Sequence, residues 1–306
     1  MAGVIGTSNH PKALWPGVKG WWGRSYNDHQ EEFGELFDKE TSDQAYEEFV
    51  QITGFGLAPV KPQGKAAEYD SETQGPTTRF VHVAYALGYI VTHEELKDDL
   101  YMEVSKSRAP SNARAFRQTK ERVCANIYNR GFNAAFLGAD GVPLFSVSHP
   151  NTSGGVYSNR LLVDADLSEA ALEDMIILQM QATDDRGMLI NLMPRSLHVA
   201  PANWFNANRI LKSVYQVGNA NTDINVIHAT NALPMGIKLN HYFTSPQAWF
   251  IRTNIEKGKG MVFLEREAIS FDQDTDFDTK NAKALGYERY SAGWVDPRAV
   301  YGSNGP

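Results

Sequence analysis

Histidine, cysteine and glutamate side chains form the patterns in this sequence that come nearest to a zinc or nucleophile site. The segment His93-Glu94-Glu95 begins like the zinc-binding helix of a metalloprotease, but Lys97 stands where the second histidine ligand is required. None of the eight histidines pairs with a serine or cysteine in a recognisable nucleophile motif. The single cysteine, Cys124, falls within a helical pattern, where we expect a small buried hydrophobe.

Acidic side chains alternate near the C-terminus in two patterns that could bind calcium or transfer protons. Four aspartates are spaced as in a calcium loop: Asp272, Asp274, Asp276 and Asp278. Phe277 and Lys283 replace the required glycine and bidentate glutamate, so a solvated strand edge is the better interpretation. Glu265 and Glu267 share a strand face, as many exposed carboxylate pairs do. We predict no catalytic residue, metal site or cofactor, although triads assemble in space and an enzyme stays open as an alternative.

Composition and charge exclude several classes of protein. The 306 residues are 42% hydrophobic, which is enough for a sizeable core in one or two domains. A net charge of −7 does not indicate a dedicated nucleic-acid binder. One cysteine excludes an internal disulfide framework and fits a reducing cytosol. No apolar run approaches the ~18 residues of a membrane span, and the N-terminal residues lack a secretory-signal pattern.

The segment from Gln51 to Val91 has the pattern of a long β-hairpin that cannot bury itself. Its return strand, 78–91, alternates with a period of two residues and places six apolar side chains on one face: Val81, Val83, Tyr85, Leu87, Tyr89 and Val91. The outgoing strand is expected over 52–60, with a polar tip over 61–77. The return strand could extend roughly 46 Å, close to the diameter of a whole domain. Its apolar face therefore needs a neighbouring subunit or a folded-back meander of the same sheet.

A tryptophan-rich arm precedes the hairpin. Trp15, Trp21 and Trp22 would be costly to leave in water, so residues 1–26, expected to be irregular, wrap their own domain or dock on a partner. Residues 28–50 are expected to form two short amphipathic helices with an acidic outer face.

Two helices are predicted after the hairpin. Thr92 is a good N-cap for a helix to about Ser105, with Glu95 completing a capping box, and Pro110 is expected to break that helix. A longer helix then spans 111–136. It carries five basic side chains: Arg114, Arg117, Lys120, Arg122 and Arg130. Such a face is usually solvated, but it could also face a nucleic acid.

The remaining sequence mixes helices with strands. Ser168 is predicted to cap a helix to about Thr183, and Pro201 to open a helix that ends near Val214. Strands are expected over 189–200, 225–228, 236–239, 248–253, 261–267 and 282–300. Because helices and strands do not alternate as βαβ units, the fold class is α+β.

The order of these elements resembles the major capsid protein of tailed bacteriophages, a fold shared with encapsulin shells. Residues 198–204 (HVAPANW) are similar to that family's strand that ends in a proline and a tryptophan-bearing helix start. Residues 225–230 (NVIHAT) and 233–236 (LPMG) resemble the axial-domain strand and turn, and 287–298 (YERYSAGWVDPR) resemble the returning strand. Residues 145–150 (FSVSHP) resemble the Mu-like head-subunit group. Order and spacing carry the resemblance rather than any one motif.

The resemblance implies a fold in five segments. These are an N-terminal arm (1–50), an extended loop hairpin (51–91), a peripheral domain (92–198) with a spine helix at about 111–136, an axial domain (199–265), and a return to the peripheral domain (266–306). In that family the extended loop lies across the adjacent subunit. The implied intersubunit contacts are Trp15, Trp21, Trp22, Lys61, Lys65, Glu68, Asp70 and Glu72, and the five basic residues of the long helix are candidates to face DNA.

The resemblance also implies a function and partners. Copies would form pentamers and hexamers that close an icosahedral phage head around double-stranded DNA, assembled in the host cytoplasm and found in the virion. A scaffolding protein, a portal and a decoration protein are implied partners, and a membrane is not. The alternatives are an encapsulin-like compartment or, from a different class, a soluble oligomeric enzyme with a long dimerisation arm.

Overall fold

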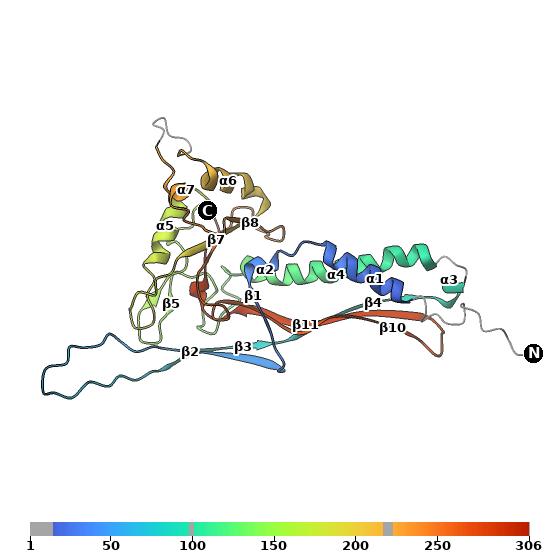
Figure 1. The fold of residues 1–306 in the computed structure, drawn as a ribbon, viewed down its shortest axis with the longest axis horizontal. Helices are drawn as coiled ribbons and strands as arrows, with labels where there is room; N and C mark the ends of the chain where they lie inside the picture. The colour runs from blue at the N-terminus through green and yellow to red at the C-terminus, as the bar shows by residue number, and fades with distance from the viewer. Residues whose placement is uncertain (1–14, 98–100, 217–222, 306) are drawn as a thin grey trace, which may run out of the picture.

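The computed structural model describes residues 15–97, 101–216 and 223–305. They form an elongated subunit with three parts: a long layer of helices on a sheet, an upright body at one end of that layer, and a hairpin that projects beyond the body (Figure 1). This mixture of helices and sheets confirms the α+β class. Within the described residues, no helix combines the length and the apolar character needed to cross a membrane.

The long layer is built on a four-stranded sheet with the order β1-β10-β11-β4. β10 (Met261–Thr275) and β11 (Ala282–Trp294) form its antiparallel centre. β1 (Asp38–Thr41) runs parallel to β10 at one edge, and β4 (Val83–Val91) runs antiparallel to β11 at the other. Both central strands are much longer than a typical strand, which gives the layer its length.

The helix α4 (Tyr101–Asn129) lies along this sheet and contains Pro110 in its interior. The prediction that Pro110 breaks the helix was therefore wrong, and the helix ends at Asn129 rather than at 136. Ala109 and Ala113 on either side of the proline are fully buried against the sheet, and this burial keeps the helix continuous despite the missing N–H. Phe116 packs so closely on β11 that a Cβ at Gly286 would overlap its ring.

The N-terminal arm is helical from Trp15, which corrects the prediction of an irregular arm. In α1 (Trp15–Asp28), the Trp22 ring stacks on Tyr26 at 5.5 Å and on Phe271 at 5.1 Å between ring centroids. The Trp22 indole N–H donates to Asn112 Oδ1 at 2.9 Å. Burial of this aromatic cluster outweighs the low helix propensity of the glycines in α1.

The predicted hairpin exists, but its strands differ from those predicted. The outgoing strand β2 (Tyr46–Ile52) pairs with β3 (Gln74–Val81), so it starts well before 52. Residues 53–73 between them contain no helix or strand. The predicted return strand divides into two parts, because β3 pairs with β2 while β4 joins the long sheet. β2 and β3 pack on the long layer through Phe80, which is buried with Val262 and Leu264, so the loop is the part that projects beyond the body.

The second helix expected within 28–50 is wrong, because that segment is the strand β2. The first exists as the short helix α2 (Phe33–Leu36). Phe49 of β2 meets Phe80 of β3 edge-on at 5.5 Å, and Phe80 is buried. This segment is a strand because it pairs with β3, which is distant in sequence. A pattern of neighbouring residues cannot show such a partner.

The upright body has its own four-stranded sheet with the order β12-β9-β7-β8. Its strands are β7 (Pro194–Val199), β8 (Ile237–Leu239), β9 (Trp249–Thr253) and β12 (Val300–Ser303). Leu197, Val199, Trp249, Ile251 and Tyr301 are fully buried in one core with side chains of the flanking helices. β7 begins at Pro194, inside the strand predicted over 189–200.

Three helices flank this sheet: α5 (Glu169–Met180), α6 (Trp204–Lys212) and α7 (Val226–Ala229). The predicted cap of α5 is confirmed, because the Ala171 N–H donates to Ser168 Oγ at 3.2 Å. The strand predicted over 225–228 is wrong, because Asn225 Oδ1 accepts the His228 N–H at 3.2 Å and caps α7 instead. Asparagine at an N-cap favours a helix over the strand that its β-branched neighbours suggest.

Candidate assembly surfaces

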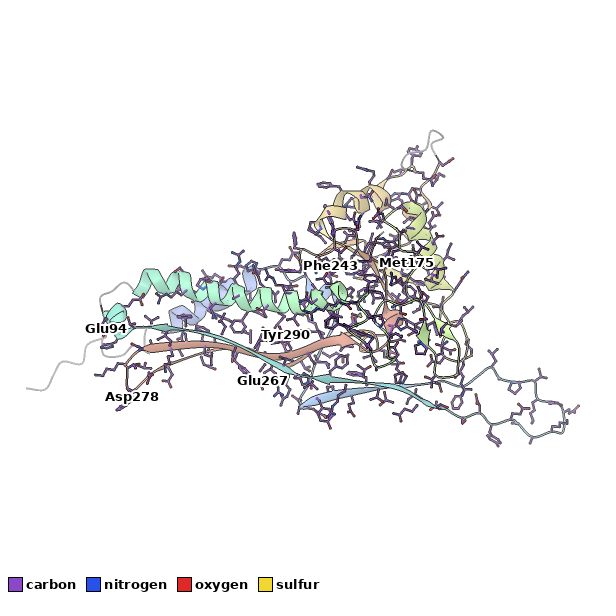
Figure 2. The ribbon with its side chains drawn as sticks, turned by 180° about the vertical axis from the view of Figure 1, so that it is seen from behind. Glu94, Met175, Phe243, Glu267, Asp278 and Tyr290 are labelled. Carbon is purple, nitrogen blue, oxygen red and sulfur yellow. The ribbon has the colours of Figure 1, made fainter. Side chains whose placement is uncertain are left out.

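The hairpin loop projects beyond the body (Figures 1 and 2), and exposed apolar side chains lie on both the loop and the strands of the hairpin. Four of them lie in the loop: Phe55, Leu57, Val60 and Tyr69, the last of which is 96% exposed. Others lie on the strands: Val50, Ile52 and Val81. The charged residues expected at contacts are exposed too: Lys61, Lys65, Glu68, Asp70 and Glu72. Exposed apolar side chains gathered on one projecting segment mark an interaction surface.

The base of the hairpin loop is held in a defined position. Thr53 Oγ1 donates to the Thr73 carbonyl at 3.0 Å, and the two backbones are also bonded. The Arg186 guanidinium donates to the Ser71 carbonyl at 2.6 Å. Hydrogen bonds from the Gly56 and Ser71 N–H groups, with Arg186 nearby, lower the pKa of the Asp70 carboxyl. These contacts fix the base of the loop relative to the rest of the subunit.

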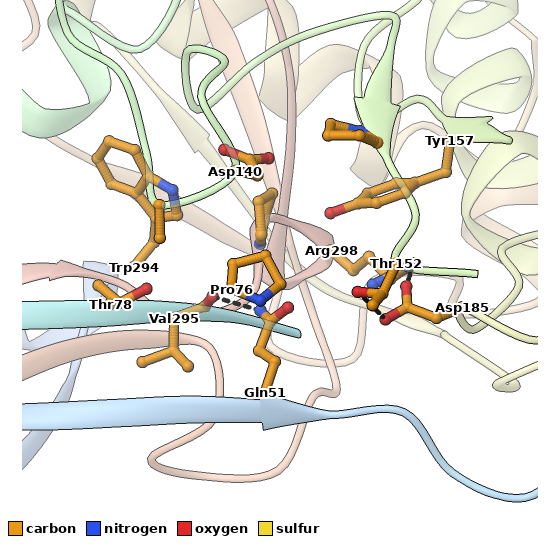
Figure 3. Close-up of a pocket in the computed structure, with 13 residues that line it drawn as sticks. Gln51, Pro76, Thr78, Asp140, Thr152, Tyr157, Asp185, Trp294, Val295 and Arg298 are labelled. Atoms are coloured by element: carbon orange, nitrogen blue, oxygen red, sulfur yellow. Dashed lines mark hydrogen bonds and ion pairs between the residues drawn. The ribbon is translucent and has the colours of Figure 1, made fainter. Parts of the chain in front are cut away.

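A cluster of polar residues lies where the hairpin meets the body (Figure 3). Gln51 Nε2 of β2 donates to the Val295 carbonyl at 2.6 Å. Behind it, the Arg298 guanidinium is buried, bonds Asp185 at 3.1 Å and lies 3.7 Å above the Tyr157 ring. Arg298 comes from the C-terminal segment and Asp185 from the loop after α5, so the cluster ties distant segments to the hairpin base.

A second buried network continues from this cluster. His149 Nδ1 lies 2.6 Å from Asp140 Oδ2, and its Nε2 lies 3.1 Å from Asn159 Oδ1. Asn159 Nδ2 in turn donates to the carbonyls of Leu144 and Val300 at 2.6 and 3.1 Å. The network was not predicted, because its members become neighbours only in the fold. The one sequence signal nearby is the FSVSHP pattern, which contains His149. That pattern indicates a family resemblance and does not indicate a buried hydrogen-bond network.

The arm tryptophans occupy different environments. Trp22 is 4% exposed and packed inside its own chain, so the prediction that it contacts a neighbour is corrected. Trp21 is partly buried against the same cluster. Trp15 opens α1, and its side chain lies outside the described residues. The open alternative that the arm wraps its own domain therefore holds for α1.

Two of the five basic residues predicted to face DNA are buried in ion pairs, which corrects that prediction for both. The Lys120 side chain is 4% exposed and bonds Glu288 at 2.7 Å. The Arg117 side chain is 11% exposed and bonds Glu31 at 3.3 Å. Lys120 points toward the sheet, and Arg117 lies beside α2. The helical pattern of the sequence could not show these partners, because they are distant along the chain. Arg114, Arg122 and Arg130 are exposed and stay candidates for a DNA-facing surface.

Glu121 is a buried carboxylate that holds the start of α2. Its two oxygens accept the Glu32 and Phe33 N–H groups at 3.0 and 2.8 Å, and Arg117 lies 3.9 Å away. Burial raises the pKa of Glu121 to about 7, although both N–H groups and Arg117 act to lower it. Folding therefore favours the protonated form of this side chain.

We expect Glu121 to make the unassembled subunit less stable as the pH rises from 5 to 8. A folded-state pKa above the unfolded value gives stability that is present at low pH and lost as the pH passes about 7. The free energy of unfolding of the wild type should fall by on the order of 2 kcal/mol relative to Glu121→Gln across this range. Urea titrations at pH 5, 6, 7 and 8 measure the difference. The exposed Glu94→Gln is the control. A wild-type free energy of unfolding that stays constant or rises relative to Glu121→Gln as the pH increases would contradict the assignment.

The side chains singled out as possible metal ligands or reactive groups have other surroundings in the structure. Within the described residues, no group of three or more His, Cys, Asp and Glu side chains could hold a metal ion. Asp276 accepts a hydrogen bond from Lys283 at 2.6 Å. Cys124 is fully buried, as predicted, and burial raises the pKa of its thiol.

The fold is that of phage capsid proteins. A structure from Mycobacterium phage Patience matches with a TM-score of 0.53 and 10% identity, covering 100% of this chain and 90% of that chain. The capsid of Myoviridae phage XM1 matches with a TM-score of 0.52 and 13% identity, covering 91% and 94%. The procapsid of bacteriophage JBD30 matches with a TM-score of 0.51 and 13% identity, covering 96% and 76%. At these identities the likeness concerns the fold.

Sequence comparison identifies the family. The family model described as phage capsid protein matches residues 75–303, which is most of the chain. No curated protein matches the chain. The chain belongs to the phage capsid protein family. It is thus a structural protein of the virion and a major capsid protein that forms the phage head, which confirms the resemblance to tailed-phage capsid proteins.

Proposed function

We propose that copies of this chain form pentamers and hexamers that close an icosahedral shell around double-stranded DNA. The observation that carries this proposal is the projecting hairpin, whose apolar side chains are exposed in the isolated subunit. A neighbouring copy supplies their cover when the hairpin lies across it. Each subunit gives one hairpin and receives another, so several modest contacts act together at high effective concentration.

Assembly in the host cytoplasm with a scaffolding protein, a portal and a decoration protein completes the proposal. Its support is the family to which the chain belongs. The Mu-like head-subunit group is the subgroup proposed, on the strength of the FSVSHP pattern.

Exposed arginines on α4 and directly after it support contact with the packaged DNA. Arg114 and Arg122 lie on α4, and Arg130 follows its last residue. Between 111 and 136 the sequence contains one acidic residue, Glu121, and it is buried. A net charge of −7 does not oppose this role, because salt screens charges beyond ~8 Å and the inner surface alone meets DNA.

Changing these three arginines to glutamine should weaken non-specific DNA binding and its salt dependence. Each phosphate neutralised contributes about 0.9 to the slope of log K against log salt, so the slope should fall by about 2 to 3. Fluorescence anisotropy with a short duplex at several salt concentrations measures it. The control Lys257→Gln, Lys259→Gln and Lys280→Gln removes the same charge from exposed sites elsewhere. An equal fall in the control would contradict a specific role for α4.

Electron microscopy and sedimentation of the purified chain test the proposed assembly. We expect closed particles that contain five-fold and six-fold units. Particles loaded with protein cargo instead of DNA would favour the encapsulin-like alternative. A species no larger than a dimer at every concentration would contradict the proposal and favour the enzyme alternative.

A further inference from the structure

Two helices on different sides of the upright body each expose a row of side chains, called a stripe. One stripe carries negative charge and the other carries positive charge. The first, called the acidic stripe, consists of Glu173, Asp174, Ile177 and Met180 on α5, all of which are exposed. The second, called the basic stripe, consists of Phe205, Arg209 and Lys212 on α6, also exposed. Figures 1 and 2 place α5 along one side of the body and α6 toward its opposite, upper side.

Each stripe follows the helical repeat, so its members share one face. Positions 173, 177 and 180 are spaced by four and three residues, and so are 205, 209 and 212. The opposite faces are buried in the common core, through Leu172, Met175 and Ile176 on α5 and through Ala207 and Ile210 on α6. The stripes are therefore the outward faces of helices whose inner faces are already occupied.

The acidic stripe also has an apolar half that lies open to solvent. Ile177 is 51% exposed, and Leu162, in the loop before α5, is 87% exposed. A groove of about 310 Å³ runs between them and includes Asp174 in its lining. Arg160 is the basic residue beside this groove, and its charge is paired with Asp164.

The order of groups along the two helices matches in an antiparallel arrangement. Along α5 the acids come first and the apolar residues follow, whereas along α6 Phe205 comes first and the two cations follow. With both helices rising about 1.5 Å per residue, the acids face the cations while Phe205 meets Ile177 and Met180. α6 itself contains no acidic residue, so nothing on it repels the acidic stripe.

We propose that α5 of one subunit docks antiparallel on α6 of the next copy of the same chain. One body uses different surfaces toward its two neighbours, so the contact is heterologous, and repetition closes a ring. This inference rests on the proposed function and deepens it, because it identifies the surface that joins subunits within a pentamer or hexamer. Its partner is a second copy, selected by the matching order of charged and apolar side chains.

Cysteine cross-linking tests this contact directly. The variant Ile177→Cys/Phe205→Cys should form a ladder of disulfide-linked species that ends at five or six subunits. Cys124, the one native cysteine, is fully buried and should not interfere. The variant Glu173→Cys/Phe205→Cys is a register control, because its two positions lie about one helical turn apart in the antiparallel alignment and should link at least fivefold less. Equal linking in both pairs, or a product that stops at dimers, would overturn the proposal.

Charge reversal provides a second test. The changes Glu173→Lys/Asp174→Lys should raise the protein concentration at half-assembly at least tenfold, through repulsion from the basic stripe. Adding Arg209→Glu/Lys212→Glu to the same chain should restore assembly to within threefold. Wild-type particles with an unaffected reversal variant would overturn this contact and leave the proposed shell intact. Failure of the wild type to form particles would instead count against the proposed function, while the cross-linking result would still decide the contact.

Discussion

Replacement of residues 54–72 by Asn-Gly is expected to abolish particle formation while leaving the subunit folded. Thr53 and Thr73 are already hydrogen-bonded across the hairpin, so a two-residue turn can close β2 and β3. The deletion removes Phe55, Leu57, Val60 and Tyr69, whose side chains are exposed in the free subunit and therefore contribute little to its stability. It also removes the ion pair of Asp70 and the hydrogen bond of the Ser71 carbonyl with Arg186, and both loop residues are exposed, where such contacts contribute little to stability.

Sedimentation velocity and urea unfolding together measure this result. We expect the variant to sediment as the free subunit or a small oligomer, with a free energy of unfolding within about 1 kcal/mol of the wild-type subunit. Leu57→Ser/Val60→Ser/Tyr69→Ser is the matched control, because it removes the apolar side chains but keeps the loop length. Particles of normal size from both variants would contradict the role of the hairpin.

Lys120→Met is expected to destabilise the subunit by about 3–5 kcal/mol, because it leaves the Glu288 carboxylate buried without its partner. The Lys120 ammonium is 2.7 Å from Glu288, whose side chain is 0% exposed, and it lies 5.1 Å from the Tyr290 ring centroid. Burial alone would lower the pKa of Lys120, but Tyr26 and Glu288 outweigh burial and raise it. Burial raises the pKa of Glu288, and Lys120 acts to lower it, so each group stabilises the charged form of the other and the pair links α4 to β11.

The double variant Lys120→Met/Glu288→Leu distinguishes the cost of an unpaired buried charge from the cost of replacing the two side chains. Because no uncompensated charge is left, it should recover most of the stability lost in Lys120→Met. Arg114→Met removes an exposed cation from the same helix and should change the free energy of unfolding by less than about 0.5 kcal/mol. Urea unfolding of the three variants gives the values. A loss below about 1 kcal/mol in Lys120→Met would mean that Lys120 has no buried partner in solution.

The sequence revealed most about segments whose structure depends on neighbours along the chain. Thr92 caps α3 (His93–Lys97) as predicted, with the Glu95 N–H 3.3 Å from its Oγ1, and Ser168 caps α5. The period of two residues over 78–91 correctly indicated extended structure. It could not show that β3 and β4 belong to different sheets, because that depends on the partners β2 and β11.

The errors occur where tertiary packing overrides local preference. Pro110 lies within a helix because its alanine neighbours are buried, and glycine-rich α1 is helical because Trp22 stacks on Phe271. The candidate contacts show the same limit. The hairpin was found from its polar tip and alternating strand, whereas the burial of Lys120 depends on Glu288, which is distant in sequence.

Hydrogen exchange of residues 54–72 tests the central claim most directly. In the dissociated subunit this loop has few backbone hydrogen bonds, and its amides should exchange rapidly. In assembled particles a second copy should cover the loop, so exchange of the peptides that span it should slow at least 100-fold. Equally rapid exchange of these peptides in intact particles would show that no copy covers the hairpin and would contradict the account.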